Sequence, residues 1–454
     1  MGSQLFPATQ ASGRLSVARD GTAAFSTIRA AIAAARAGDC VIVYPGTYKE
    51  NNLLKDRVNL FFMPGAVVDY DATNDDDGLG IFDDRNGAVT CTISGEGVFK
   101  FKDTLNDITQ ANANLFGLFY ISQALTSISL KAKQLQATAW VSEGGCAVRV
   151  NNATRVDIEV DDISDPNFGQ SILDVDGVTT WQSAGTGVIW AKGETYIKAH
   201  TILGSNYGLW AKGDNDGATD ANLWMECDFL KSGPGSAAYW SGGVTANWRT
   251  WLKCQEIECV AVEGVSGAVN WLGGGRHYVE AQKITAPGNV FFVQGAGGFD
   301  PSVWLNAQKL SGGGSVAQKL LTVASGVLHA TVMHFEDNGF AAGAINVTGG
   351  ELNLTGGLAK ILNGPGIIQS GGIARISGLR MDTANTNNVA NVPVSVSSAG
   401  LTLRNCVLVA PALADSVKGD AARTITNYGS VANKAKNANV TVNVAALIVD
   451  ANVV

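Results

Sequence analysis

The clearest pattern in the chain is a seven-residue stretch in which apolar and polar positions alternate behind a large aromatic residue. It reads WLKCQEI at residues 251–257, YVEAQKI at 278–284 and WLNAQKL at 304–310. Side chains of a β-strand point alternately to its two faces, so this period of two predicts a strand with one buried and one exposed face. In the last copy, Leu305, Ala307 and Leu310 are expected to face the core.

The same template can be followed along most of the chain, with leading positions 23 to 39 residues apart and weaker matches at Arg57 and Thr90. The leading positions are Ser129, Asp157, Tyr196, Trp224, Trp251, Tyr278, Trp304, Val327, Glu351, Arg375 and Thr402. A second signature, a bulky residue three positions before a glycine, begins at Trp190, Trp210, Trp240, Trp271, Phe292, Val323, Val347 and Ile368. Each repeat therefore contains at least two strands separated by a turn.

Repeats of this length without a helical period predict a β-solenoid, in which stacking buries the apolar face that one repeat cannot bury alone. The period of two excludes helical repeats, and a β-propeller needs blades of about 40 residues. We therefore predict an all-β fold, a β-solenoid of about a dozen coils. Equivalent residues of successive coils should lie about 4.8 Å apart, the spacing of neighbouring strands.

The start of the chain has a different pattern. Apolar residues recur at helical spacing from Phe25 to Ala35, which predicts an amphipathic helix over residues 26–37 with Ser26 as its N-cap. Residues 40–44 then read as a buried strand. A helix in this place is expected to close the open end of the solenoid core.

The run STIRAAIAAARAGDCVIVYPGTYKEN, residues 26–51, resembles the entrance of pectin-lyase-like right-handed parallel β-helix proteins, among them pectin methylesterases and many phage tailspikes. The resemblance implies an N-terminal segment with a capping helix over residues 1–50 and a right-handed parallel β-helix over 51–411. Residues 412–454 are rich in Asn and Val, which predicts a short β-rich C-terminal tip. In tailspike-like proteins such a segment often joins three chains, so it is also a candidate oligomerisation segment.

The exposed face of the main strand is the predicted functional surface. Its leading column contains Tyr196, Trp224, Trp251, Tyr278 and Trp304, and its third column contains Gln255, Gln282 and Gln308. Three interpretations of the aromatic column remain open. It could be a groove in which rings pack on sugars, a subunit interface anchored by Trp and Tyr, or a surface that turns of the same chain cover.

Two carboxylates on this face are candidate catalytic groups. Hydrolysis of a glycosidic bond uses a carboxylate pair about 5 to 9.5 Å apart, and Glu226 and Asp228 should lie about 7 Å apart along one strand face. Glu226 alternates with Lys198 and Lys253, which is also the pattern of a ladder of opposite charges. The catalytic motifs of polygalacturonases, pectin methylesterases and pectate lyases are absent, so no catalytic residue is carried over from these families.

Metal and cofactor chemistry receives little support from the sequence. Seven Cys include no CxxC pair and lie mostly in apolar runs, which favours buried reduced thiols, and four His have no zinc spacing. We predict no cofactor and no metal. The acidic positions Asp157, Glu159, Asp161, Asp162, Asp165, Asp174 and Asp176 could bind calcium, although a solvated loop explains them as well.

Composition and the chain start bear on partners and location. The net charge of −8 argues against non-specific binding to nucleic acid. No apolar run approaches the 18 or so residues of a membrane span, and MGSQLFPATQ has no signal-peptide pattern. We expect synthesis in the cytoplasm without a signal peptide, followed by residence on a virion or other extracellular particle.

The sequence as a whole favours a phage or phage-derived tail spike or fibre protein. The expected assembly is a homotrimer that recognises a cell-surface polysaccharide and contacts other tail or baseplate proteins. One alternative is a polysaccharide hydrolase or lyase of the pectin-lyase-like group, although the sequence leans against an enzyme. The other alternative is a structural scaffold without a ligand.

Overall fold

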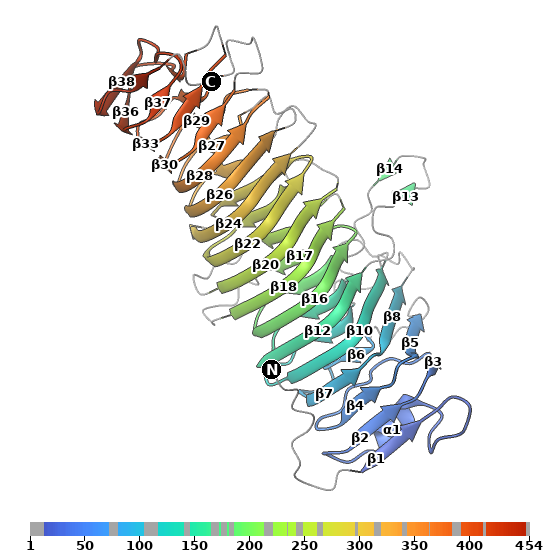
Figure 1. Cartoon of the computed structure of the whole chain (residues 1–454). Coiled ribbons are helices and arrows are strands. Elements are labelled where there is room, and N and C mark those ends of the chain that lie inside the picture. The colour runs from blue at the N-terminus through green and yellow to red at the C-terminus, as the bar shows by residue number, and fades with distance from the viewer. Residues whose placement is uncertain are drawn as a thin grey trace. The chain divides into compact units, whose positions relative to one another are not determined.

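A computed structural model describes residues 13–71, 80–103, 117–139, 146–164, 172–173, 179–180, 186–212, 221–233, 235–241, 248–260, 267–295, 298–312, 319–337, 343–362, 364–383, 392–411 and 415–450. The chain forms two compact units. The first unit contains residues 1–166, 182–185 and 192–200, and the second contains residues 167–181, 186–191 and 201–454. Each unit is a stack of parallel β-coils, as the alternation of apolar and polar residues predicted (Figure 1).

The first unit contains strands of a long sheet and of a short sheet. The long sheet contains β1 (Arg14–Val17), β2 (Cys40–Val43), β3 (Gly46–Tyr48), β4 (Asn59–Phe62), β5 (Ala66–Asp71), β7 (Thr90–Gly95), β8 (Val98–Asp103), β10 (Ser127–Ala139) and β12 (Arg155–Ser164). The short sheet contains β6 (Phe82–Asp83), β9 (Gly117–Ile121) and β11 (Cys146–Val150). Residues 194–200 of β16 (Glu194–Gly204) also belong to this unit.

The second unit repeats the same coil. Its long-sheet strands are β18 (Ala221–Ser232), β20 (Trp248–Cys259), β22 (Gly275–Ala286), β24 (Pro301–Gly312), β26 (Val327–Asp337), β28 (Glu351–Lys360), β30 (Ile373–Ser377), β31 (Arg380–Asp382), β33 (Leu401–Arg404), β34 (Val407–Val409), β36 (Arg423–Tyr428), β37 (Val431–Ala432), β38 (Val440–Val444) and β39 (Ile448–Val449). A small antiparallel pair, β13 (Ile172–Leu173) and β14 (Thr179–Thr180), is also present.

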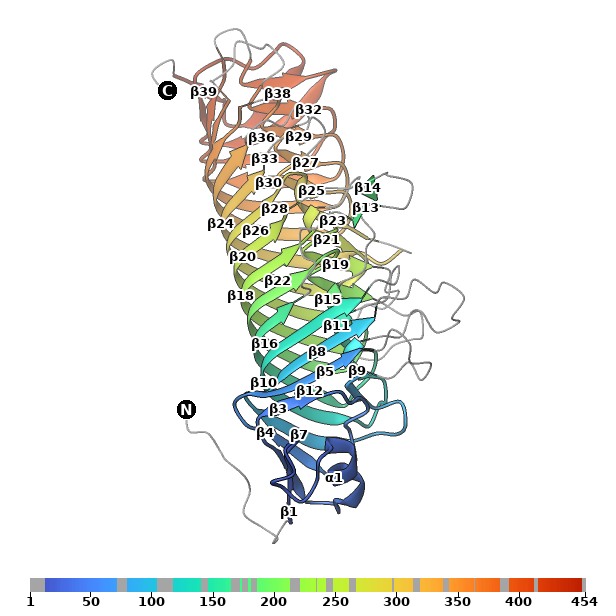
Figure 2. The same ribbon diagram turned by 90° about the vertical axis from the view of Figure 1, so that its right-hand side faces the viewer.

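The short sheet of the second unit forms another face of its coils (Figure 2). Its strands are β15 (Thr186–Trp190), β17 (Leu209–Lys212), β19 (Ala238–Ser241), β21 (Gly267–Leu272), β23 (Asn289–Gln294), β25 (Leu321–Val323), β27 (Ile345–Val347), β29 (Ile367–Gln369), β32 (Val394–Val396) and β35 (Val417–Gly419). The second sequence signature therefore marks real strands. The predicted pattern of two strands per repeat is confirmed.

The long strands bend at one position. In β20 both Gln255 and Glu256 point outward in succession, which shifts the alternation by one residue. Near the C-terminal end the bend becomes a break, since β28 pairs with β30 and then with β31. Gly378, Asn405 and Gly429 occupy this corner with φ of 67°, 50° and 71°. These left-handed conformations suit glycine and asparagine, which explains the residue types at the corner.

The core forms as the alternation predicts, since Leu305, Ala307 and Leu310 are all buried. The alignment of two repeats, those led by Val327 and Glu351, was however wrong by two residues, whereas Arg375 and Thr402 lie in the predicted column. Trp304 pairs with His329, whereas the sequence template placed Val327 at that position. The alternation of apolar and polar residues could not reveal this misalignment, because a shift of two residues leaves every side chain on the same face.

The C-terminal segment is β-rich, and its strands join the same parallel stack. Strand β36 pairs with β33 on one side and with β38 on the other. In the same way, β37 pairs with β34 and with β39. All of these pairings are parallel, so the coil geometry extends through this segment of the second unit.

The N-terminal helix is shorter than predicted. It is α1 (Ile28–Ala34), and its N-cap is Thr27, not Ser26. The Thr27 side chain accepts a hydrogen bond from Ala30 N at 3.3 Å. Thr27 takes the role because its backbone is extended, at φ −131° and ψ 146°, while the next residue is already helical. Buried Ile28, Ala31 and Ile32 form the apolar face of the helix.

Two later side chains fix the ends of α1. The carboxylate of buried Glu50 accepts hydrogen bonds from Ile28 N at 2.9 Å and Arg29 N at 2.8 Å. Lys55 Nζ donates to the carbonyls of Ile32, Ala33 and Ala35 at 3.1, 3.1 and 2.7 Å. A negative group at the N-terminus and a positive group at the C-terminus both oppose the helix dipole. Glu50, the last residue of the PGTYKE motif, therefore has a structural role.

Replacing Glu50 by Gln is expected to lower the free energy of unfolding by about 1–3 kcal/mol. The amide has one acceptor oxygen for two backbone donors and lacks the charge that strengthens both bonds. Denaturant unfolding followed by far-UV circular dichroism measures the change. Glu96→Gln is the control, since Glu96 is exposed and makes no side-chain hydrogen bond within the described residues. Equal losses in the two variants would contradict this role.

Candidate functional site

Aromatic rings form a continuous stack on the outward face of β18, β20, β22, β24 and β26. Trp224 and Trp251 have ring centroids 4.7 Å apart and Trp251 and Tyr278 5.5 Å apart. Tyr278 and Trp304 follow at 4.7 Å, and Trp304 and His329 at 5.5 Å. The planes of neighbouring rings differ by 1°, 4°, 11° and 14° along the stack. We call these five residues the aromatic ladder.

The ladder follows directly from the strand register. Trp224 pairs with Trp251, Trp251 with Tyr278, Tyr278 with Trp304 and Trp304 with His329. Neighbouring strands are about 4.8 Å apart, so identical positions bring flat rings to stacking distance. Sequence reasoning predicted four of these rings and missed His329, which would have been found with the correct register.

The rings cover one another. Each face of Trp251, Tyr278 and Trp304 is taken up by a ring of the neighbouring strand, so the ring edges remain to face outward. An aromatic ring carries negative charge on its face and positive charge at its edge. The ladder therefore offers a stripe of weakly positive edges, and a sugar cannot stack flat on its inner rings.

Tyr196, the remaining ring of the predicted column, belongs to the first unit. It lies on β16, and the guanidinium of Arg155 packs over its ring at 4.5 Å from the centroid. Arg155 also forms an ion pair with Asp157 at 2.7 Å. The face of Tyr196 is thus used by a cation of the same unit.

Polar columns flank the ladder. Glu226 lies 3.8 Å from Lys253 Nζ, and both side chains are about 60% exposed, at 58% and 61%. Gln255 Nε2 donates to Asp228 Oδ1 at 2.5 Å. Gln282 and Gln308 are exposed at the equivalent positions of the next two strands. Glu226 and Asp228 do share the outward face of β18, but each is engaged by a side chain of the neighbouring strand.

Further along the same strands, ion pairs connect successive coils. Lys231 Nζ lies 2.7 Å from Glu258 and Lys283 Nζ lies 2.7 Å from Glu256, and Lys309 pairs with Glu336. Exposed pairs of this kind contribute little individually, about 0–1 kcal/mol. Their regularity still matters, because every lysine of β18, β20, β22 and β24 has a carboxylate partner.

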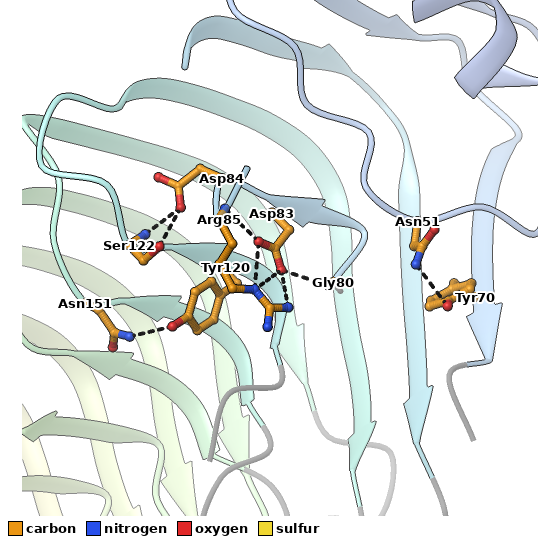
Figure 3. Close-up of polar contacts among 9 residues, drawn as sticks. All are labelled: Asn51, Tyr70, Gly80, Asp83, Asp84, Arg85, Tyr120, Ser122 and Asn151. Carbon is orange, nitrogen blue, oxygen red and sulfur yellow. Dashed lines mark hydrogen bonds and ion pairs between the residues drawn. The ribbon is translucent and has the colours of Figure 1, made fainter. Parts of the chain in front are cut away.

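A buried polar network in the first unit was not anticipated from the sequence, and Figure 3 shows its residues Asp83, Arg85 and Tyr120. Asp83, Tyr120 and Arg149 occupy one column of β6, β9 and β11, and all three are buried. Arg85 forms an ion pair with Asp83 at 2.6 Å, and its guanidinium lies 4.9 Å from the centroid of the Tyr120 ring. Burial raises the pKa of Tyr120, while Arg149 and Arg85 act in the opposite direction.

The side chain of the next residue, Asp84, is held in place by hydrogen bonds inside the first unit. Its carboxylate accepts hydrogen bonds from Ser122 N at 2.7 Å, Ser122 Oγ at 3.0 Å, Gln123 N at 2.9 Å and Thr126 Oγ1 at 2.7 Å. Asn151 donates to the Tyr120 hydroxyl at 2.9 Å, and Asn51 to the Tyr70 hydroxyl at 2.9 Å (Figure 3). Buried polar groups with this many partners are typical of structural networks, so we assign this one to the fold.

The interior of the second unit holds an internal aromatic cluster, consisting of Trp190, Trp240, Trp248, Trp271, His277 and Phe291. Trp240 and Trp271 stack at 4.3 Å with an angle of 19° between their planes. Trp210, which begins another copy of the second signature, does not belong to this cluster. It pairs with Tyr239 on the outward face and donates to Ser241 Oγ at 2.7 Å.

The cysteines are free thiols, as predicted, and all except the partly exposed Cys40 are buried. Cys227 and Cys254 occupy paired positions with their Sγ atoms 3.1 Å apart. Burial raises the pKa of Cys91 and that of Cys146 to about 12. These thiols are therefore poor nucleophiles at neutral pH.

The described residues include no group of three or more side chains arranged to hold a metal ion. In the acidic segment considered for calcium, Asp157 pairs with Arg155 and Glu159 pairs with Lys131 at 2.9 Å. Asp165, Asp174 and Asp176 lie outside the described residues. In the same part of the chain, no helix has the length and apolar character needed to cross a membrane.

Comparison with protein-family models, with curated proteins and with solved structures finds no match to this chain. The assignment of a parallel β-helix therefore rests on the strand register itself.

Proposed function

We propose that this chain is a tail spike or fibre protein of a phage or phage-derived particle, and that it recognises a cell-surface polysaccharide with the outward face of β18 to β26. The observation that carries the proposal is the aromatic ladder between two polar columns. Ring edges, amides and charged groups form a regular, rigid strip of donors and acceptors. An extended polymer with hydroxyl groups along its length is the ligand that such a strip suits.

Binding is favoured over cleavage by the state of the two carboxylates. Glycosidases leave two carboxyl groups free to flank the bond that they cleave. Glu226 is instead exposed near Lys253, and Asp228 accepts a hydrogen bond from Gln255. A hydrolase or lyase of the pectin-lyase-like group remains the alternative, and Glu226→Gln in a depolymerisation assay distinguishes the two.

The expected assembly is a homotrimer built into a particle with other tail or baseplate proteins. Its support is the resemblance of residues 26–51 to the entrance of pectin-lyase-like β-helices, a group that includes many phage tailspikes. The aromatic ladder of one chain would then lie on the outer surface of the trimer or along a boundary between chains.

Replacing both Trp251 and Trp304 by Ala is expected to abolish binding to a panel of bacterial surface polysaccharides, because it interrupts the ladder at two of its five rings. A glycan array with the full chain measures binding, and light scattering of the same samples measures mass. The wild type should have about three times the chain mass of 47.2 kDa. Trp210→Ala with Tyr239→Ala is the matched control, since it removes two outward aromatic residues from the short sheet.

A ligand-free scaffold is the second candidate, and the mutual stacking of the ladder is the observation in its favour. Aromatic pairs contribute about 0.5–1.5 kcal/mol beyond the area they bury, so the ladder alone can stabilise the contact between coils. In that case the ladder variant would lose stability, and neither it nor the wild type would bind any polysaccharide. A monomeric wild type would contradict the proposed trimer.

A further inference from the structure

We propose that Arg249 and Arg276 form an anion-binding site beside the aromatic ladder, and that the polysaccharide recognised here is acidic. This inference rests on the proposed function and specifies the class of its ligand. The site consists of two guanidinium groups on neighbouring strands, β20 and β22, at paired positions of the register. Both side chains are exposed on the outward face.

The arginine pair adjoins the middle of the ladder. Arg249 lies two residues before Trp251, and Arg276 lies two residues before Tyr278, on the same face of their strands. Two residues of a strand span about 7 Å, and neighbouring strands are about 4.8 Å apart. A ligand lying across the Trp251 and Tyr278 edges would therefore reach both guanidinium groups.

These two arginines differ from the other cations of this face. Each lysine of β18, β20, β22 and β24 has a carboxylate partner on a neighbouring strand. Arg249 and Arg276 make no ion pair and no side-chain hydrogen bond within the part of the chain that the structure describes. Like charges directly opposite each other in a sheet are destabilising. An anion bound between the two guanidinium groups would remove this repulsion.

The surroundings suit an acidic sugar. Asn222 and Ser302 occupy the same column on the two flanking strands and are partly exposed, so they can bond neighbouring hydroxyl groups. The ring edges of Trp251 and Tyr278 are weakly positive and also favour oxygen atoms. Arginine binds carboxylate and phosphate groups in a planar, two-bond geometry. The shared chemistry of the ligand is thus an oxyanion carried on a sugar, either a uronic carboxylate or a sulfate or phosphate ester.

The test measures binding of the full-length protein to polygalacturonate, dextran sulfate and neutral dextran, with polyglutamate as an acidic polymer without sugar. The test variant is Arg249→Gln with Arg276→Gln, and the ladder variant Trp251→Ala with Trp304→Ala is run beside it. The matched control is Lys360→Gln with Arg404→Gln, which removes two exposed positive charges from other strands of the same sheet.

Binding of the wild type to at least one acidic polysaccharide should be tighter than its binding to dextran, and it should weaken as salt is added. The arginine variant should lose about tenfold or more in affinity, while the control keeps the wild-type affinity. The two acidic probes distinguish a carboxylate from a sulfate ligand. The Arg249→Lys and Arg276→Lys variant should recover only part of the affinity, since lysine lacks the two-bond geometry.

Two results would overturn the inference while leaving the proposed function intact. One is loss of acidic polysaccharide binding in the ladder variant with full binding in the arginine variant. The other is equal affinity for dextran and the acidic polysaccharides. Equal affinity for polyglutamate would show anion binding without sugar recognition and overturn the inference as well. Failure of the wild type to bind any of the polysaccharides would overturn the proposed function, and the inference with it.

Discussion

Replacing Trp271 by Ala is expected to lower the free energy of unfolding by about 3–5 kcal/mol, the range for deleting a buried aromatic side chain. Trp271 is fully buried and stacks on Trp240, with its ring 5.0 Å from that of Phe291. Its Nε1 has no hydrogen-bond partner among the described residues, so the loss comes from apolar contact and from the cavity left behind. Denaturant unfolding followed by circular dichroism measures it.

Trp304→Ala is the matched control, because it removes the same side chain from the outward face of a neighbouring coil. Trp304 is partly exposed and contacts its neighbours mainly through the two ring stacks of the ladder. Two stacks at about 0.5–1.5 kcal/mol each predict a smaller loss than that of Trp271→Ala. Trp271→Phe should recover part of the internal loss. Equal destabilisation by the two alanine variants would contradict the distinction between cluster and ladder.

Acidification between pH 6.5 and about 4 is expected to destabilise the second unit through His277. Burial lowers the pKa of His277 from 6.5 to about 4. Its ring is held between Thr250 Oγ1, 2.9 Å from Nδ1, and the Gly274 carbonyl, 3.0 Å from Nε2. A carbonyl only accepts, so Nε2 carries the proton and Nδ1 accepts from the Thr250 hydroxyl.

The direction follows from proton uptake on unfolding. Between pH 6.5 and about 4 the unfolded chain binds a proton at His277 that the folded chain does not, so stability falls as the pH falls through this window. The full effect is about 3 kcal/mol, reached near pH 4, and stability from this residue is constant above pH 6.5.

The pH dependence of the unfolding midpoint in wild type and in His277→Gln tests this. Glutamine can bond both Thr250 and Gly274 but takes up no proton, so the variant should lack this part of the acid destabilisation. Titration of carboxylates is common to both proteins and cancels in the difference. His334→Gln, which removes an exposed histidine, should keep the wild-type profile. Parallel profiles for wild type and His277→Gln would contradict the assignment.

The period of two in the sequence was enough to predict the strands and the core. Leu305 and Ala307 alternate with Trp304 and Asn306, and a strand has only one way to bury the first pair while exposing the second. The outward direction of the ladder rings followed from the same argument. The apolar face of the N-terminal helix was also visible in its spacing, although the cap was displaced by one residue to Thr27.

The tertiary structure decided which residues of successive coils contact one another and how their side chains pack. A slip of two residues preserves the alternation, so the pattern could not distinguish His329 from Val327 as the partner of Trp304. The same pattern contains no information on ring planes, and only the three-dimensional arrangement shows that the ladder rings cover one another.

The burial of charged side chains and their ion pairing could not be predicted from the sequence either. The Asp83 carboxylate is buried in an ion pair with Arg85, which the alternation of apolar and polar residues did not predict. The repeat aligned Arg249 with Arg276, two residues before Trp251 and Tyr278, but nothing in the sequence shows that neither arginine has a carboxylate partner. Alternation along a strand is a local property, which the sequence alone determined. Register, stacking and charge pairing join residues distant in the chain, so only the folded coils could establish them.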